Sequence, residues 1–69
     1  MTLAELQELH RAGVAVVTPD EAEPWKIVKC SRATWYRLMN SGDLPFVLVL
    51  GRSRRLQLAG LIRWLGVEL

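Results

Sequence analysis

The chain has 69 residues, of which 51% are hydrophobic and 23% charged, and its formal net charge is +2. This length and composition allow one small globular domain and exclude a second core or an intrinsically disordered chain. The single cysteine excludes an internal disulfide, and without a membrane span or a secretory signal we expect a cytoplasmic protein with no membrane partner.

The charge is distributed unevenly along the chain. Residues 1–25 carry one base and five acids, a net charge of −4, whereas residues 26–69 carry eight bases and two acids, a net charge of +6. Such asymmetry favours a negatively charged partner that faces the second part of the chain. A solvated basic face without a partner is the alternative interpretation.

The N-terminal segment predicts a helix and then an extended run. Thr2 and Glu5 fit a capping box, so we expect a helix from Leu3 to about Ala12, ended by Gly13. The β-branched run of residues 14–17 then predicts extended chain or a brief strand.

Two helices with a very short connection are predicted next. Thr18 and the acids after it indicate a helix that runs to about Val28, and Pro24 either lies in its first turn or restarts it. Ser31 is a strong N-cap candidate for a further helix over residues 32–40, which Gly42 ends. Helices so closely joined cross steeply, so the second one projects and can enter the major groove of DNA.

A β-hairpin and a closing helix complete the predicted elements. Residues 46–50 and 54–58 predict two strands joined by a reversal at Gly51, and the last helix is expected over about residues 58–65. The hairpin carries arginines at its tip and on its return strand. Gly60 is unexpected, because glycine inside a helix costs about 1 kcal/mol relative to alanine.

The segment Cys30–Pro45 resembles the signature of excisionase-type, MerR-like winged helix-turn-helix domains. The matching residues are Ser31-Arg32, Thr34, Tyr36-Arg37 and Gly42-Asp43-Leu44-Pro45. The resemblance covers roughly residues 20–65 and implies an α+β, mainly α fold, with a two-stranded hairpin as the wing and an extra N-terminal helix. We expect residues 1–17 to form an N-terminal helical extension and residues 18–69 the DNA-binding domain.

The resemblance also implies which residues face DNA. In this family the helix after the serine cap enters the major groove, and the wing arginines contact the minor groove or the backbone. Arginines suit phosphate or guanine, and a tyrosine, serine or threonine hydroxyl can donate to phosphate unless it is used in capping. The candidate DNA-binding residues are Ser31, Arg32, Ala33, Thr34, Tyr36, Arg37, Arg52, Arg54 and Arg55.

Several residues have a structural interpretation instead. Arg55 can pair with an acid such as Asp43 or Glu21, and the three tryptophans are expected in the core rather than on a base-stacking surface. We expect a buried, inert thiol at Cys30 rather than a reactive one. The apolar wing strand, residues 46–50, needs a cover, and we expect the N-terminal helix to pack on it, with a neighbouring monomer or another protein as the alternative contact for that helix.

These observations predict a DNA-binding architectural factor rather than an enzyme. No carboxylate pair, nucleophile–base set or metal cluster can be assembled, so neither a cofactor nor a metal is expected. The family includes phage and mobile-element excisionases, or recombination directionality factors, which bind double-stranded DNA cooperatively beside copies of themselves, bend it and assist an integrase. A small AlpA-like transcription regulator is the alternative, followed by a protein-interaction adaptor that no longer binds DNA.

Overall fold

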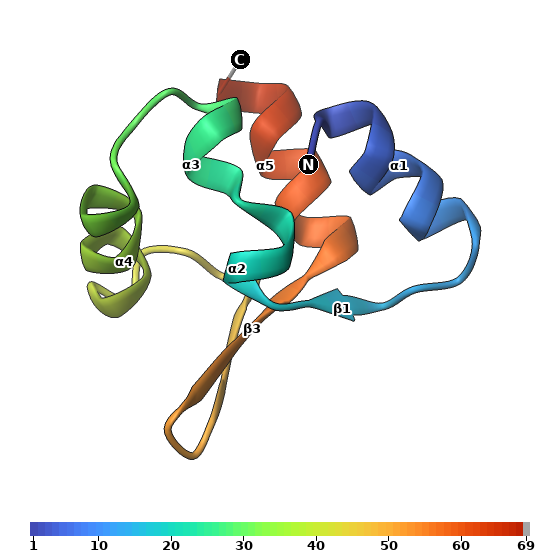
Figure 1. Ribbon diagram of the computed structural model, residues 1–69. Coiled ribbons are helices and arrows are strands. Elements are labelled where there is room, and N and C mark those ends of the chain that lie inside the picture. The colour runs from blue at the N-terminus through green and yellow to red at the C-terminus, as the bar shows by residue number, and fades with distance from the viewer. Residues whose placement is uncertain (69) are drawn as a thin grey trace.

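The computed structural model describes residues 1–68, in which short helices surround a small antiparallel sheet (Figure 1). In chain order the elements are α1 (Leu3–Arg11), β1 (Val16–Val17), α2 (Pro19–Ala22), α3 (Pro24–Ile27), α4 (Arg32–Asn40), β2 (Val47–Leu50), β3 (Ser53–Gln57) and α5 (Leu58–Glu68). This confirms the expected α+β, mainly helical fold with a hairpin wing. The sheet differs in one respect, because β1 pairs with β3 and adds a third strand in the order β1-β3-β2.

The first helix begins and ends as its sequence predicts, but it packs elsewhere. The backbone N–H of Thr2 donates to the Glu5 carboxylate, whose own backbone N–H donates to the Thr2 hydroxyl, and Gly13 has a φ of 92°. Leu6 is fully buried, and α1 packs chiefly against α5. The expectation that α1 covers the wing strand is therefore wrong at the wing tip, where Val49 and Leu50 stay exposed.

The region around Pro24 forms two short helices rather than one. Glu23 has a left-handed backbone, with a φ of 47°, and separates α2 from α3, which starts at Pro24. Proline lacks the N–H that a continuous helix would use, and its ring clashes with the carbonyl four residues earlier. Of the two possibilities that the sequence leaves open, the restart at Pro24 is therefore correct.

The α4 helix has the predicted bounds and an amphipathic packing. The backbone N–H of Thr34 donates to the Ser31 hydroxyl over 3.0 Å, which caps the helix start. Trp35 and Met39 point inward and are buried. The opposite side of α4 is left for solvent or a partner.

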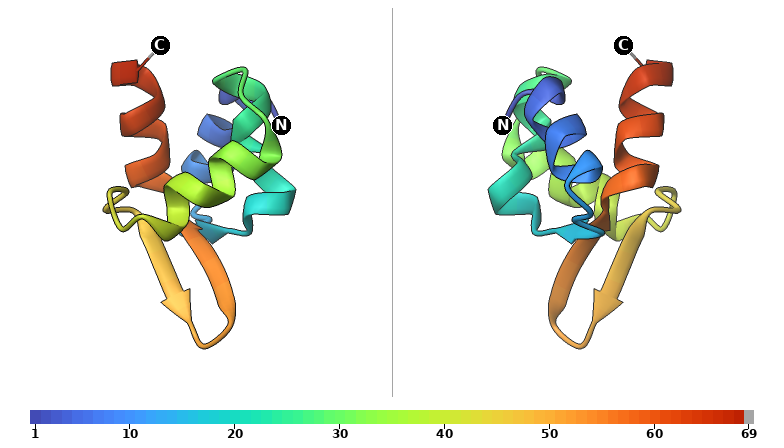
Figure 2. Two further views of the ribbon diagram at one scale, coloured as in Figure 1. Left: turned by 90° about the vertical axis from the view of Figure 1, so that its left-hand side faces the viewer. Right: turned by 90° about the vertical axis from the view of Figure 1, so that its right-hand side faces the viewer.

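The β2–β3 hairpin projects from the helical body as a wing (Figure 2). In its register Val49 lies opposite Arg54 and Leu50 lies opposite Ser53. The side chains of Val49 and Leu50 are 62% and 58% exposed, because no helix reaches the end of the wing. The wing tip thus combines apolar side chains with arginines.

Aromatic side chains fill the core where the wing joins α5. Trp35 is fully buried and lies edge-on to Trp64, with ring centroids 5.6 Å apart, and the ring centroid of Phe46 lies 5.8 Å from that of Trp64. The prediction that the tryptophans belong to the core is confirmed for Trp25 and Trp35, while Trp64 is half-buried.

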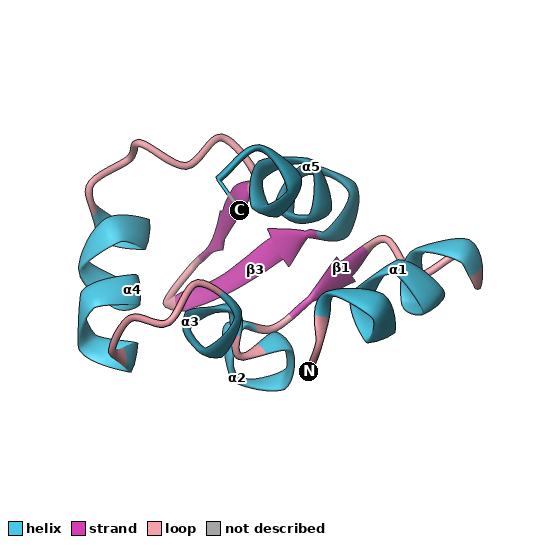
Figure 3. Ribbon diagram, turned by 90° about the horizontal axis from the view of Figure 1, so that it is seen from above, coloured by secondary structure: helices cyan, strands magenta, loops and turns pink. Residues whose placement is uncertain are grey.

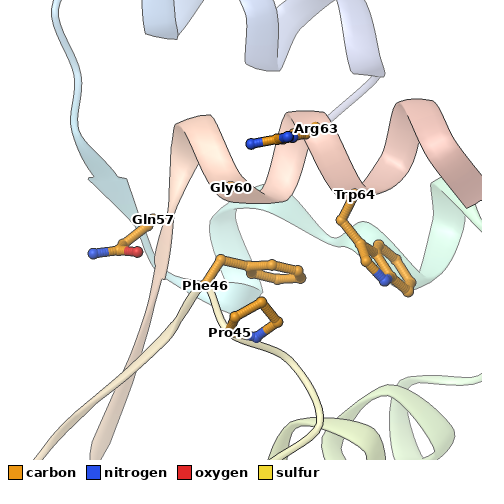
Figure 4. A pocket seen from close by; sticks show the side chains of 6 residues that line it. All are labelled: Pro45, Phe46, Gln57, Gly60, Arg63 and Trp64. Carbon is orange, nitrogen blue, oxygen red and sulfur yellow. The ribbon is translucent and has the colours of Figure 1, made fainter.

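The unexpected glycine in α5 is explained by this same contact. A Cβ at Gly60 would lie 2.6 Å from the Cβ of Phe46, closer than real Cβ atoms approach. Figure 4 shows the Phe46 side chain lying against α5 at Gly60, with Trp64 one turn along. Gly60 therefore lets the root of the wing approach the helix backbone.

Candidate nucleic-acid interface

The outer face of α4 carries most of the predicted DNA-binding residues. Positions i, i+1, i+4, i+5 and i+8 of a helix share one side. On α4 these are Arg32, Ala33, Tyr36, Arg37 and Asn40, all exposed except the partly buried Tyr36. This face lies opposite the buried Trp35 and Met39 and is open to a ligand.

The hydroxyl groups of Ser31 and Thr34, at the start of α4, differ in how far hydrogen bonds within the protein already use them. The Ser31 hydroxyl accepts the Thr34 N–H and donates to the Thr34 hydroxyl over 2.7 Å, so capping uses it fully. The Thr34 oxygen also accepts an N–H of Arg37 over 3.3 Å. Thr34 keeps its own hydroxyl hydrogen for an outside acceptor, whereas Ser31 contributes by fixing the helix start.

Arg32 and Tyr36 are joined by Asp20 in a contact that the sequence alone does not predict. Oδ1 of Asp20, in the first turn of α2, accepts Arg32 Nε at 3.3 Å, Arg32 Nη2 at 3.1 Å and the Tyr36 hydroxyl at 3.2 Å. The Arg32 guanidinium lies over the Tyr36 ring, 4.5 Å from its centroid, and 5.8 Å from the ring of Trp25. A cation above an aromatic face is held by the negative charge density of the ring.

This cluster shifts the proton affinity of both α4 side chains. The hydrogen bond and charge of Asp20 raise the pKa of Arg32, which stays charged under all ordinary conditions. Burial raises the pKa of Tyr36 first, and the hydrogen bond to Asp20 raises it further. The Tyr36 hydroxyl is therefore a neutral donor at physiological pH.

The wing arginines lie on different faces of the hairpin. Arg54 donates to the Asn40 side-chain oxygen over 3.4 Å and so connects the wing with the end of α4, while Arg52 lies exposed at the turn. Arg55 lies opposite Leu48 on the other face of the wing and donates to the carbonyl oxygen of Arg54 over 3.1 Å.

The predicted alternative for Arg55, an ion pair with an acid, is not formed within the part of the chain that the structure describes. The charge of Arg55 still acts on Glu21. Hydrogen bonds from Thr18 are the main cause that lowers the pKa of Glu21, and attraction by Arg55 adds to them.

Positive charge gathers on α4 and the wing. Among the described residues, Arg37, Arg52 and Arg54 have no carboxylate within 4.0 Å, whereas Arg11 on α1 pairs with Glu8. Seen from above, α1 and α4 lie on opposite sides of the sheet (Figure 3). The acids of α1 are thus kept away from the arginine-bearing face.

An open depression of about 390 Å³ lies beside the Phe46–Gly60 contact, and its lining includes Gln57, Trp64 and one charged residue, Arg63 (Figure 4). Among residues 1–68 no three His, Cys, Asp or Glu side chains gather in a way that could hold a metal ion. None of the described helices is both long enough and apolar enough to cross a membrane.

Comparison with known proteins gives one match. A family model described as a helix-turn-helix domain matches residues 16–66. No curated protein and no solved structure matches the chain significantly. The matched range extends from β1 into α5 and contains α4 and the whole wing.

Proposed function

The chain belongs to the helix-turn-helix domain family, a family of DNA-binding domains, and we propose on this basis that α4 and the wing together bind double-stranded DNA. In this proposal α4 enters the major groove and the wing reaches the adjacent minor groove or its phosphates. The proposed contacts are Arg32, Ala33, Thr34, Tyr36, Arg37, Arg52, Arg54 and Arg55, while Ser31, also a predicted contact, fixes the start of α4.

The strongest support for this proposal is the continuous exposed strip that α4 and the wing form together. The exposed face of α4 continues into the wing through the hydrogen bond between Asn40 and Arg54. Along this strip Arg37, Arg52 and Arg54 have no carboxylate partner among the described residues. Arginines without a carboxylate partner on a projecting helix and hairpin complement the negative charge of duplex DNA.

The residues have different roles in this mechanism. Arg37 reaches from the middle of α4 to phosphate or to a guanine, and Thr34 donates its free hydroxyl to the backbone near the helix start. Ala33 is small, so it lets α4 lie deep in the groove and can meet a thymine methyl group. Arg52 suits a narrow minor groove, where the negative potential is enhanced.

We further propose that the protein is an excisionase, a DNA-bending accessory factor that brings integrase sites together. The resemblance of residues 31–45 to the excisionase signature supports this role, and neighbouring copies and an integrase would be its partners in a bacterial cytoplasm. Bending costs several kcal/mol, which the added contacts of adjacent copies would offset. Residues 1–17 would then be an extension that stabilises the DNA-binding unit through Leu6 and α5.

Arg37→Ala combined with Arg52→Ala tests the DNA surface. Removing two phosphate contacts lowers the slope of log K against log salt by about 2, and affinity for a duplex falls at least roughly tenfold. Arg11→Ala combined with Arg63→Ala is the matched control, because it removes the same charge outside the proposed face. Equal losses in both double variants, measured by fluorescence anisotropy across a salt series, would refute the surface.

An in vitro excision assay with an integrase encoded beside the gene separates the two genetic roles. Stimulated excision together with binding to clustered direct repeats supports the excisionase. Binding to a promoter palindrome without any effect on excision supports the transcription regulator.

A further inference from the structure

The cluster of Asp20, Arg32 and Tyr36 lies at the first half of α4, the helix proposed to enter the major groove. Asp20 Oδ1 receives all three hydrogen bonds, two from Arg32 and one from the Tyr36 hydroxyl. The cluster lies on the surface, since the side chains of Asp20 and Arg32 are 65% and 60% exposed. It therefore acts where a ligand of α4 would arrive, rather than inside the core.

The geometry leaves one edge of the Arg32 guanidinium free. A guanidinium has five N–H groups in a planar fork. Asp20 takes the Nε–H and one Nη2–H, which form the side edge. One Nη1–H and the remaining Nη2–H form the end edge, which no hydrogen bond among residues 1–68 uses, and such a pair of donors can bind O6 and N7 of a guanine.

Two further contacts limit how Arg32 can move. Its guanidinium lies 4.5 Å from the centroid of the Tyr36 ring, and the same ring is held by the hydrogen bond from its hydroxyl to Asp20. Trp25 lies beside both, 6.2 Å from Tyr36 between ring centroids. These contacts restrict the orientation of Arg32 on α4, and the negative charge of Asp20 disfavours its binding to a nearby phosphate.

We propose that Asp20 is a specificity-determining residue that fixes the side edge of Arg32 so that its end edge reads a guanine in the major groove. This inference rests on the proposed DNA binding and adds to it a residue outside α4 and the wing. Without Asp20, Arg32 becomes a mobile cation that binds phosphate, and phosphate contacts carry no sequence information.

The Asp20→Asn variant, named D20N, tests this role with Glu8→Gln as the matched control. Both changes remove one acidic charge, but Glu8 lies on α1. The probes are the duplex that the wild-type protein enriches most from a randomised 20-base-pair pool, that duplex with each base pair changed in turn, and a random-sequence duplex. D20N should bind the random duplex several-fold more tightly, and its salt slope should steepen by about 1.

At the guanine read by Arg32, D20N should lose about tenfold or more of the preference over other bases. Arg32→Ala should lose the same preference, and the double variant with D20N should lose no more than Arg32→Ala alone. An unchanged guanine preference in D20N overturns the assignment, as does equal loss in Glu8→Gln.

A measurement without DNA tests the contact itself. Tyr36 is the only tyrosine of the chain, so the phenolate absorbance near 295 nm reports it alone. The pKa of Tyr36 should fall in D20N, because the negative charge that raises it is removed and the amide oxygen of asparagine is a weaker acceptor, and should stay unchanged in Glu8→Gln. An unchanged pKa in D20N shows that the contact is absent and overturns the inference.

The outcomes separate the two proposals. If neither the wild-type protein nor D20N binds any duplex, the proposed function fails and the role of Asp20 fails with it. If the wild-type protein binds DNA through Arg37 and Arg52 while D20N keeps every preference, the function stands and the role of Asp20 alone is refuted.

Discussion

Replacing Gly60 by alanine should destabilise the protein, although alanine is the better helix former. Helix propensity alone favours alanine by about 1 kcal/mol. The added Cβ would lie 2.6 Å from the Cβ of Phe46, which is attached directly to the backbone of the wing root and cannot rotate away. Relieving such a contact means separating α5 from residue 46, and overpacking of this kind costs about 1–3 kcal/mol. Since a Cβ is the least movable side-chain atom, we take the upper end of this range, about 3 kcal/mol. Subtracting the gain of about 1 kcal/mol in helix propensity leaves an expected net loss of stability of about 2 kcal/mol.

Gly66→Ala provides the matched control on the same helix. Among the described residues, no atom outside the helix's own backbone lies within 4 Å of a Cβ at Gly66, so the propensity term dominates and the variant should gain up to about 1 kcal/mol. Urea denaturation followed by tryptophan fluorescence measures both. For a chain of this size the loss at Gly60 corresponds to a fall in Tm of roughly 8–16 °C. A Gly60→Ala variant as stable as the wild-type protein would refute the explanation of this glycine.

Other predictions concern the caps and the core. Thr18→Ala should cost about 1 kcal/mol at pH 7, the usual loss for an N-cap threonine. Hydrogen bonds from Thr18 hold the pKa of Glu21 in the folded protein below its ordinary value of 4.5. The Thr18–Glu21 contact therefore stabilises the folded protein fully at any pH above the pKa of Glu21 in the unfolded chain. This stabilisation is lost as the pH falls through the lower pKa of Glu21 in the folded protein. The difference between Thr18→Ala and the wild-type protein in urea denaturation should therefore narrow at pH 3, and a constant difference would contradict this. Trp35→Ala should remove about 3–5 kcal/mol, most of the stability of so small a domain, and leave little helical signal in far-UV circular dichroism. Trp35→Phe should lose less, because it also removes an indole N–H that is buried without a hydrogen-bond partner among residues 1–68; equal losses would count against this.

The sequence predicts those parts of the fold that local chemistry decides. Thr2 and Ser31 mark helix starts with a side-chain oxygen, and Gly13 and Gly42 mark helix ends where the backbone turns left-handed. The outer face of α4 follows directly from helical periodicity. The candidate residues on that face could therefore be named before their surroundings were known.

Contacts between residues that lie far apart in the sequence could not be predicted from such local signals. Asp20 lies 12 residues before Arg32, and only the turns at Glu23 and Lys29, both with positive φ, bring the two together. The close approach of Phe46 to α5 likewise depends on how the wing root meets the helix. Packing of this kind depends on the whole core, so it cannot be predicted from a local pattern in the amino-acid sequence.

The position of β2 in the sheet has a consequence for how the free protein behaves in solution. In the order β1-β3-β2, this strand leaves one edge unpaired, and its residues 47–50 are all valine or leucine. Unpaired apolar edges are templates for intermolecular strand pairing, the first step of aggregation. The arginines at 52, 54 and 55 follow at once and repel a second wing, as gatekeeper charges do. Because salt screens that repulsion, concentrated protein should stay dispersed best at low ionic strength.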